Sequence, residues 1–157
     1  MKKGVDYIGV GVGAVIINKN KQIFLAKRGA NAQNEIGKWE CPGGSVRFGE
    51  TVNHALLREV KEEHGFEIEI VELLGVCDEI LLPEKQHWVS PSFLCKLKSG
   101  TPKILEPEKC EAIGWFTLEK AENLPLSLAT KINLSDLMKR YPTSLPQLYY
   151  LTKPNLL

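Results

Sequence analysis

Apolar residues occur in short runs along this chain, and the spacing within the runs changes from one segment to the next. Residues 8–17 are almost all apolar or glycine, the polar segment 18–21 follows, and residues 22–27 are again mainly apolar. This pattern predicts two buried strands joined as a hairpin. Three later apolar runs predict further strands, before and after a turn at residues 99–102: 67–77, 87–97 and 112–116.

Two segments have helical spacing instead. Residues 51–64 carry Leu56, Leu57 and Val60 on the face that should meet the core, and Gly65 stands where a helix would stop. Residues 127–140 repeat the spacing with five apolar members: Leu128, Ile132, Leu134, Leu137 and Met138. Helices of this kind must bury their apolar faces on a sheet, so we expect an α/β fold around a mixed sheet.

The remaining segments have no helical or strand pattern. Residues 29–37 are polar, residues 39–49 contain Pro42 and several glycines, and the segment after Pro142 is interrupted by further prolines. We therefore expect loops at 29–37 and at 39–49, and the last segment has no predicted structure. A length of 157 residues fits a single domain spanning residues 1–157.

Composition excludes several classes of protein. The chain is 43% hydrophobic and 25% charged with a formal net charge of +1, so no global field favours nucleic acid or an acidic membrane surface. No apolar run reaches the roughly 20 residues of a membrane span. The four cysteines are far apart, which excludes the usual zinc spacings. The apolar N-terminal run lacks a signal-peptide cleavage site, so we expect a cytoplasmic protein.

Three glutamates gather on the helix predicted at residues 51–64. At about 100° per residue, Glu59, Glu62 and Glu63 share one face beside the apolar stripe, while Arg58 lies on the side away from both. Neighbouring carboxylates repel one another, and a hard divalent cation such as Mg²⁺ compensates them through oxygen ligands; Mn²⁺ also fits. Taken on their own, the three glutamates favour a solvated acidic face, because such faces are common on helices.

The loop before this helix favours a ligand site. Gly43, Gly44 and Gly49 allow the backbone to approach a bound molecule closely, and Glu50 can reach the glutamate cluster. The loop ends at a helix N-terminus, whose free N–H groups suit an anion. At the other end of the helix, His64 is most simply a cation that the helix dipole favours. A phosphate site beside a metal site explains this stretch better than a solvated face does.

Residues 44–66 match the Nudix signature, G-x5-E-x7-R-E-U-x-E-E-x-G-U, in which U is a bulky apolar residue. Gly44 and Glu50 occupy the first fixed positions, and residues 58–66 supply the rest as REVKEEHGF. Phe66 departs slightly from the aliphatic residue usual at the last position. The signature is long and specific, so the chain is similar to the Nudix hydrolases.

This resemblance implies a fold, an activity and a set of site residues. The fold would be an α/β/α sandwich around a mixed sheet, and the activity would be metal-dependent hydrolysis of a bond between two phosphates. Glu59, Glu62 and Glu63 would hold the metal, assisted by Glu50. Arg58 would orient the glutamates by ion pairing.

Other segments resemble a narrower group, the MutT-like enzymes of the nucleotide pool, which hydrolyse nucleoside triphosphates. The resemblance is carried by residues 39–44, 48–51, 87–90 and 106–111. Members of this group often have His-Leu-Glu where residues 45–47 read Ser-Val-Arg, so the contacts on the phosphate side differ here.

Substrate and proton contacts are less clearly marked. The resemblance places a basic residue near the phosphates at the pair Lys27 and Arg28, of which we favour Arg28; a surface pair beside a loop explains them equally well. Gly43 and Gly44 could bring the backbone close to the substrate, and Trp88 could stack on a base or belong to the core. A general base could be Glu63 or a glutamate on a later loop, where we favour Glu108 over Glu111. Simple solvation of that acidic loop explains its glutamates equally well.

The sequence therefore favours a nucleoside triphosphate pyrophosphohydrolase that releases a monophosphate and pyrophosphate. A second hypothesis keeps the family but changes the substrate to ADP-ribose, another nucleotide sugar or a dinucleoside polyphosphate. The early start of the first strand, near Ile8, favours the first hypothesis. A third is a nucleotide sensor without activity, which the intact set of glutamates disfavours. A homodimer is compatible with the sequence.

Overall fold

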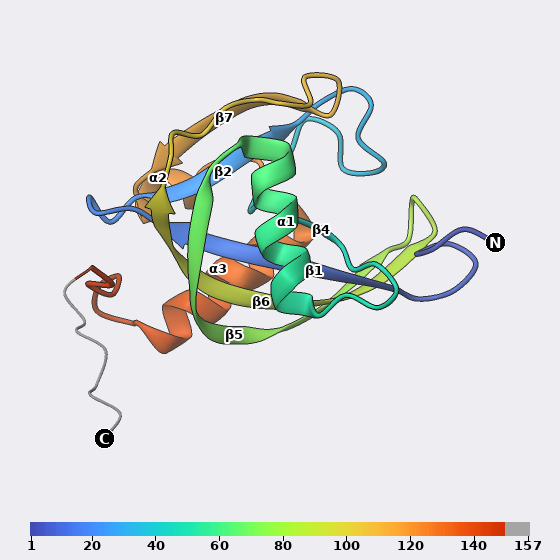
Figure 1. Cartoon of the computed structure of the whole chain (residues 1–157). Coiled ribbons are helices and arrows are strands. Elements are labelled where there is room, and N and C mark those ends of the chain that lie inside the picture. The colour runs from blue at the N-terminus through green and yellow to red at the C-terminus, as the bar shows by residue number, and fades with distance from the viewer. Residues whose placement is uncertain (150–157) are drawn as a thin grey trace.

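The computed structural model describes residues 1–149 (Figure 1). Its strands and helices follow one another in this order: β1 (Gly9–Ile17), β2 (Ile23–Arg28), β3 (Trp39–Glu40), β4 (Gly43–Ser45), α1 (Val52–His64), β5 (Glu67–Leu81), β6 (Gln86–Ser99), β7 (Cys110–Phe116), α2 (Leu118–Glu122) and α3 (Leu128–Arg140). Among these residues no helix is both long enough and apolar enough to cross a membrane.

The strands form one mixed sheet. Its order is β3-β2-β1-β6-β5, while β4 also pairs with β1 and β7 with β2. β1 and β6 run parallel, and the other pairs are antiparallel. The predicted hairpin of β1 and β2 is present, with Ile17 paired to Ile23. The prediction of a mixed sheet is therefore confirmed.

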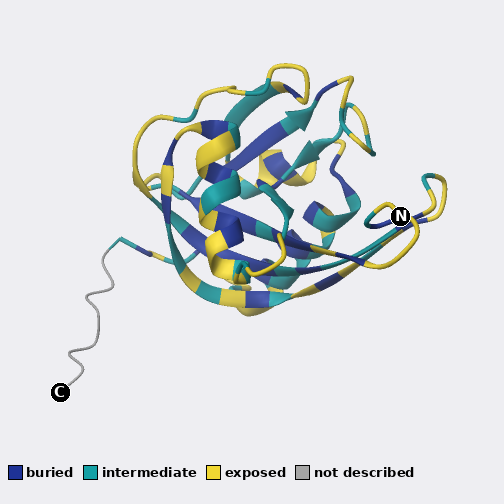
Figure 2. Cartoon of the chain, turned by 45° about the vertical axis from the view of Figure 1, so that its right-hand side comes forward, coloured by how far each residue is buried: buried dark blue, intermediate teal, exposed yellow. Residues whose placement is uncertain are grey.

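Each face of the sheet carries its own hydrophobic core. Along β1, Val12, Ala14 and Ile16 pack with the buried residues of α1, whereas Val15 and Ile17 pack with those of α3. This alternation follows from the two-residue repeat of a strand. Figure 1 shows α1 and α3 on opposite sides of the sheet, and Figure 2 shows that buried segments concentrate in the strands. The expected α/β/α sandwich is confirmed.

Helix α1 has clear signals at both ends. The Thr51 side chain accepts a hydrogen bond from the backbone N–H of His54 at 3.2 Å, which caps the first turn. Gly65 ends the helix with a φ of 70°, in the left-handed region, and its N–H donates to the Lys61 carbonyl at 3.0 Å. The predicted boundaries at residues 51–64 therefore agree with the structure to within one residue.

Two residues of α1 do not lie where the helical spacing placed them. Leu57, expected in the core, is 40% exposed, whereas the adjacent Leu56 is fully buried. His64, expected as a solvated cation, is only 2% exposed and packs edge-on against Phe24, with ring centroids 5.2 Å apart. Burial lowers the pKa of His64, because it disfavours the charged imidazole.

Three other features were not expected from local pattern. Residues 39–49 contain the short strands β3 and β4, which pair with β2 and β1. β5 and β6 are longer than predicted and form a long hairpin that closes at the pair Leu81–Gln86. α2 begins at the capping residue Thr117. Beyond Pro142, the Tyr149 hydroxyl donates to the Ile17 carbonyl at 2.8 Å, so this segment lies against the sheet.

Replacement of the two adjacent leucines of α1 tests this packing. Leu56→Ala should lower the free energy of unfolding by about 2–5 kcal/mol, because it leaves a cavity in the core. Leu57→Ala should lower it by less than about 1 kcal/mol, since this side chain is partly solvated. Urea unfolding of both variants measures the difference, and equal losses would contradict the orientation of α1.

Candidate active site

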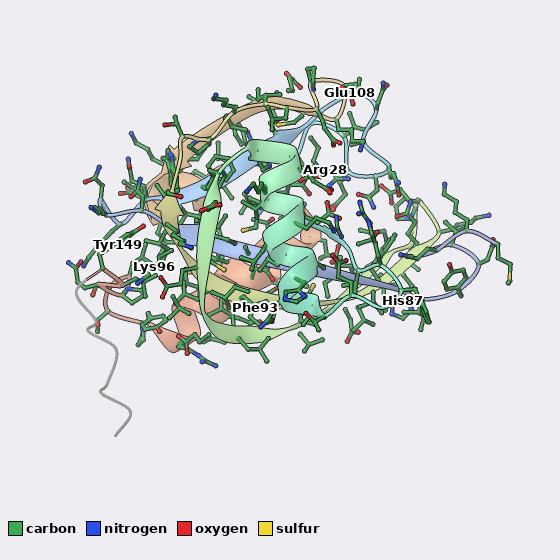
Figure 3. All side chains as sticks on the ribbon, in the orientation of Figure 1. Arg28, His87, Phe93, Lys96, Glu108 and Tyr149 are labelled. Atoms are coloured by element: carbon green, nitrogen blue, oxygen red, sulfur yellow. The ribbon has the colours of Figure 1, made fainter. Side chains whose placement is uncertain are left out.

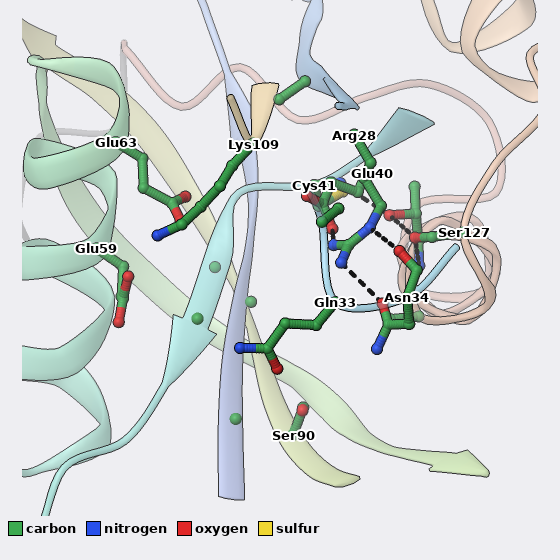
Figure 4. Close-up of a pocket in the computed structure, with 18 of the residues that line it drawn as sticks. Arg28, Gln33, Asn34, Glu40, Cys41, Glu59, Glu63, Ser90, Lys109 and Ser127 are labelled. Atoms are coloured by element: carbon green, nitrogen blue, oxygen red, sulfur yellow. Dashed lines mark hydrogen bonds and ion pairs between the residues drawn. The ribbon is translucent and has the colours of Figure 1, made fainter. Parts of the chain in front are cut away.

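A pocket of about 420 Å³ lies between α1 and the N-terminal end of α3. Its floor comes from β1, β4 and β6, and the loops that follow β2 and precede β7 also line it. Figure 4 shows Glu59 and Glu63 of α1 on one side of this pocket, with Asn34 and Ser127 on the other. The pocket therefore has an acidic end at α1 and a far end where uncharged polar groups surround the paired Arg28 and Glu40.

At the acidic end, Glu59 lies directly over Gly44 of β4. A Cβ atom at residue 44 would overlap the Glu59 carboxyl group, so only glycine permits this approach. Glu63 lines the same end one helical turn later. The pKa of Glu63 is raised to about 8, chiefly by burial and also by the charges of Glu40, Glu59 and Glu106. These carboxylates lie close enough together for their charges to repel one another.

Arg58 takes a different position from the one that helical geometry suggested, because its long side chain bends back toward the glutamates. It holds Glu50 with two hydrogen bonds, of 2.7 and 2.9 Å. It also reaches Glu59 at 2.7 Å and Glu62 at 3.1 Å. The pKa of Glu50 falls to about 2, chiefly because of the hydrogen bonds from Arg58. The ion pairing that the family resemblance implied is present.

Arg58 thus contacts three of the four glutamates predicted to bind metal: Glu50, Glu59 and Glu62. Glu62 also lies 3.4 Å from Arg47. Glu59 and Glu63 face the pocket. No group of three His, Cys, Asp or Glu side chains within residues 1–149 already converges on one point. Two carboxylates nevertheless suit Mg²⁺, which commonly binds through one or two of them together with substrate phosphates and water. The residues present therefore fit a hard divalent cation.

Arg28 lies in the pocket wall, but its guanidinium is already engaged. Its Nε donates to the Asn34 carbonyl and its Nη2 to Asn34 Oδ1, both at 2.8 Å, and it forms an ion pair with Glu40. Burial raises the pKa of Glu40, an effect that Arg28 opposes. The structure therefore places Arg28 in contact with the protein itself, with only 16% of its side chain exposed.

Trp88 also lines the pocket, and its indole packs against the N-terminal segment. Its ring covers Gly9, where a Cβ atom would overlap it, and its Nε1 donates to Gln86 at 3.0 Å. Gly43 and Gly44 both line the pocket, as the sequence suggested.

The loop before β7 contributes different residues from those expected. Glu106 and Lys109 line the pocket. Glu108 is exposed at the outer edge of the molecule (Figure 3) and is not among the lining residues. Glu111 forms an ion pair with Lys27 at 3.1 Å. The turn closed by the hydrogen bond from the Lys109 N–H to the Glu106 carbonyl brings residues 106 and 109 to the pocket and leaves Glu108 outside it, which the sequence pattern did not reveal.

Sequence reasoning also missed the uncharged groups at the far end of the pocket. Asn133 of α3 is buried, and its Oδ1 accepts a hydrogen bond from Ser92 Oγ of β6 at 2.6 Å. Gly13 of β1 lies next to this amide: a Cβ atom at residue 13 would be 3.4 Å from Asn133 Nδ2. These residues are far apart in sequence, so no local motif could have joined them.

Two adjacent glycines provide a matched test of the acidic end. Gly43→Ala would push a methyl group into the Val12 carbonyl and should lower the free energy of unfolding by about 1–3 kcal/mol. Gly44→Ala meets the movable end of Glu59, so it should destabilise the protein less but weaken Mn²⁺ binding. Urea unfolding and Mn²⁺ binding measured by electron paramagnetic resonance check both variants. Unchanged Mn²⁺ affinity in Gly44→Ala would exclude Glu59 as a ligand.

Comparisons with known proteins agree with this geometry. The family model described as NUDIX domain matches residues 8–137. "Putative nudix hydrolase 1" of Caenorhabditis elegans is 34% identical over 141 residues, covering 86% of this chain and 37% of the relative. The "8-oxo-dGDP phosphatase NUDT18" of Danio rerio is 29% identical over 142 residues, covering 90% of this chain and 40% of the relative. The chain thus spans about two fifths of the length of these curated relatives.

A solved structure shows the same fold over nearly its whole length. The MutT NUDIX hydrolase from Burkholderia pseudomallei superposes with a TM-score of 0.77 and 40% sequence identity, covering 84% of this chain and 99% of the other. Since the family model also covers most of the chain, and its signature helix lines the pocket, this chain belongs to the Nudix family, with a MutT-like structure.

Proposed function

We propose that this chain hydrolyses a phosphoanhydride bond in a nucleoside diphosphate derivative. The preferred substrate in this proposal is a nucleoside triphosphate, which is cleaved to a monophosphate and pyrophosphate. The observation that carries the proposal is the pair of carboxylates, Glu59 and Glu63, that faces one end of the pocket above Gly44. Membership of the Nudix family supports the same reaction type.

Glu59 and Glu63 would hold a divalent cation, with Mg²⁺ the preferred ion. When bound, such an ion supplies a more acidic water and neutralises charge that develops on phosphate oxygens. Arg58 keeps Glu50 and Glu62 turned toward itself, which limits the repulsion among the carboxylates of α1. It also donates to Glu59 and thereby fixes the direction of that carboxylate. Glu50 and Glu62, held by Arg58, would assist in binding the cation.

A carboxylate must also accept the proton of the attacking water. Glu63 is half-buried at the acidic end of the pocket, and the loop before β7 brings Glu106 close enough to raise the pKa of Glu63. We therefore assign the role of a general base on this loop to Glu106, in place of the exposed Glu108.

The far end of the pocket supports a nucleoside as the bound group. Gln33 and Asn133 both line it, and Figure 4 shows the Gln33 side chain extending across the pocket. An amide group offers a donor and an acceptor side by side, which suits the edge of a nucleobase. Two relatives point in the same direction, since their names are MutT hydrolase and 8-oxo-dGDP phosphatase.

The reaction can be tested with a panel of substrates in the presence of Mg²⁺. The panel contains ordinary and oxidised nucleoside triphosphates and diphosphates, ADP-ribose and dinucleoside polyphosphates. We expect the highest kcat/KM with a triphosphate, giving monophosphate and pyrophosphate in equal amounts. Glu63→Gln should lower kcat/KM by about 10²-fold or more, because the change removes both a ligand charge and a proton acceptor.

The matched control is Glu119→Gln, which makes the same chemical change at an exposed position of α2. It should leave kcat/KM unchanged. Faster turnover of ADP-ribose or of a dinucleoside polyphosphate would keep the reaction type but replace the substrate. Binding without turnover across the panel would instead identify a nucleotide sensor.

A further inference from the structure

Three cationic side chains line the pocket within residues 1–149: Lys27, Arg28 and Lys109. A polyphosphate carries several negative charges, so the distribution of these cations matters for binding it. Arg28 is held by Asn34 and by Glu40, as described above. Lys27 lies 3.1 Å from Glu111, its neighbour on the adjacent strand β7.

Lys109 differs from the other two in its position and in its freedom. Its Nζ lies 3.0 Å from Glu106 Oε2, three residues earlier in the same turn, and 55% of the side chain is exposed. Figure 4 shows the side chain extending into the pocket toward Glu63. The positive charge of Lys109 opposes the rise in the Glu63 pKa, which agrees with this placement. Lys109 is thus a cation at the rim, beside the acidic end.

The backbone of Lys109 is fixed even though its side chain is long. The Gly29 N–H donates to the Lys109 carbonyl at 2.6 Å, and the Asn31 N–H donates to the Glu108 carbonyl at 3.1 Å. A Cβ atom at Gly29 would lie 2.9 Å from the Lys109 carbonyl carbon, so the two loops meet closely only because residue 29 is glycine. The backbone of Lys109 is therefore fixed, while its long side chain can change conformation.

A nucleotide bound in this pocket would have a defined direction. Its base would contact the amides near α3, and its reacting phosphate would lie at Glu59 and Glu63. The phosphates beyond the reacting one would then reach the rim, where Lys109 stands. The last of them is terminal in a nucleoside triphosphate and carries the highest charge, whereas a nucleotide sugar has no free terminal phosphate.

We propose that Lys109 binds the terminal phosphate of a nucleoside polyphosphate by exchanging its ion pair with Glu106 for one with the substrate. This proposal rests on the proposed function and deepens it, because it assigns the phosphate subsite of the same pocket. The exchange leaves the Glu106 carboxylate without its cation beside the acidic end. No covalent step is involved, so Lys109 is a binding residue and not a proton donor.

Lys109→Gln removes the charge and keeps most of the length of the side chain. It should raise KM for a nucleoside triphosphate about tenfold to a hundredfold, the usual effect of losing a charge-assisted hydrogen bond. The kcat should stay within about threefold, since the contact is made equally in the ground state and the transition state. Lys109→Arg should restore KM to within about threefold, because it returns the charge.

Binding of inorganic tripolyphosphate gives a readout that does not depend on turnover. Calorimetry with Mg²⁺ present should show about tenfold weaker binding to Lys109→Gln than to the unaltered protein. Lys103→Gln, which removes a charge from an exposed position at the start of the same loop, should bind as the unaltered protein does. Gly29→Ala should reproduce the rise in KM, because it displaces the Lys109 backbone.

The two proposals fail in distinguishable ways. If the unaltered protein hydrolyses nucleoside triphosphates and Lys109→Gln matches Lys103→Gln in both KM and tripolyphosphate binding, the role of Lys109 is refuted and the activity stands. If the unaltered protein hydrolyses nothing, the proposed function is refuted, and tripolyphosphate binding alone decides on Lys109. A fall in kcat at constant KM would also overturn the assignment, since it would indicate a role in the chemical step.

Discussion

The carboxyl group of Glu59 can lie over β4 at the pocket floor only because residue 44 has no side chain: a Cβ atom there would overlap it. The pairing of β4 with β1 fixes that glycine in the sheet, and the burial of Leu56 and Val60 presses the helix onto the same sheet. The buried residues therefore hold the helix on the sheet, and the glycine lets the Glu59 carboxylate reach the pocket floor.

The same helix separates two electrostatic environments. On one side, the Arg58 guanidinium holds Glu50 and Glu62 and lowers the pKa of Glu50. On the pocket side, burial and neighbouring carboxylates raise the pKa of Glu63. Arg58, which also contacts Glu59, thus relieves repulsion within the protein, whereas the negative charge of Glu63 is left for a bound cation to balance. Lys109 and Arg28 do not fill that role, because each is paired with a different carboxylate, Glu106 or Glu40.

Local pattern was enough to predict the elements that build the site, and contacts between distant segments account for the rest. The helical periodicity of residues 51–64 and the stop at Gly65 predicted α1, and the fixed spacing of the signature predicted Glu59 and Glu63 as site residues. Leu57 and His64 were misplaced because helical spacing cannot tell how far the core extends around a helix. The engagement of Arg28 by Asn34, and the choice of Glu106 over Glu108, depend on how two loops meet at Gly29. The sequence of either loop alone does not predict the contact between them.

The central proposal is that Glu59 and Glu63 hold a divalent cation and that hydrolysis requires this cation. The most direct measurement is a titration of chelator-treated protein with Mn²⁺, in which bound ion and nucleotide hydrolysis are followed in the same sample. We predict no hydrolysis without the ion, and a rate of hydrolysis that rises in proportion to the amount of bound Mn²⁺. Hydrolysis that persists in the chelator, or ion binding that leaves the rate unchanged, would contradict it.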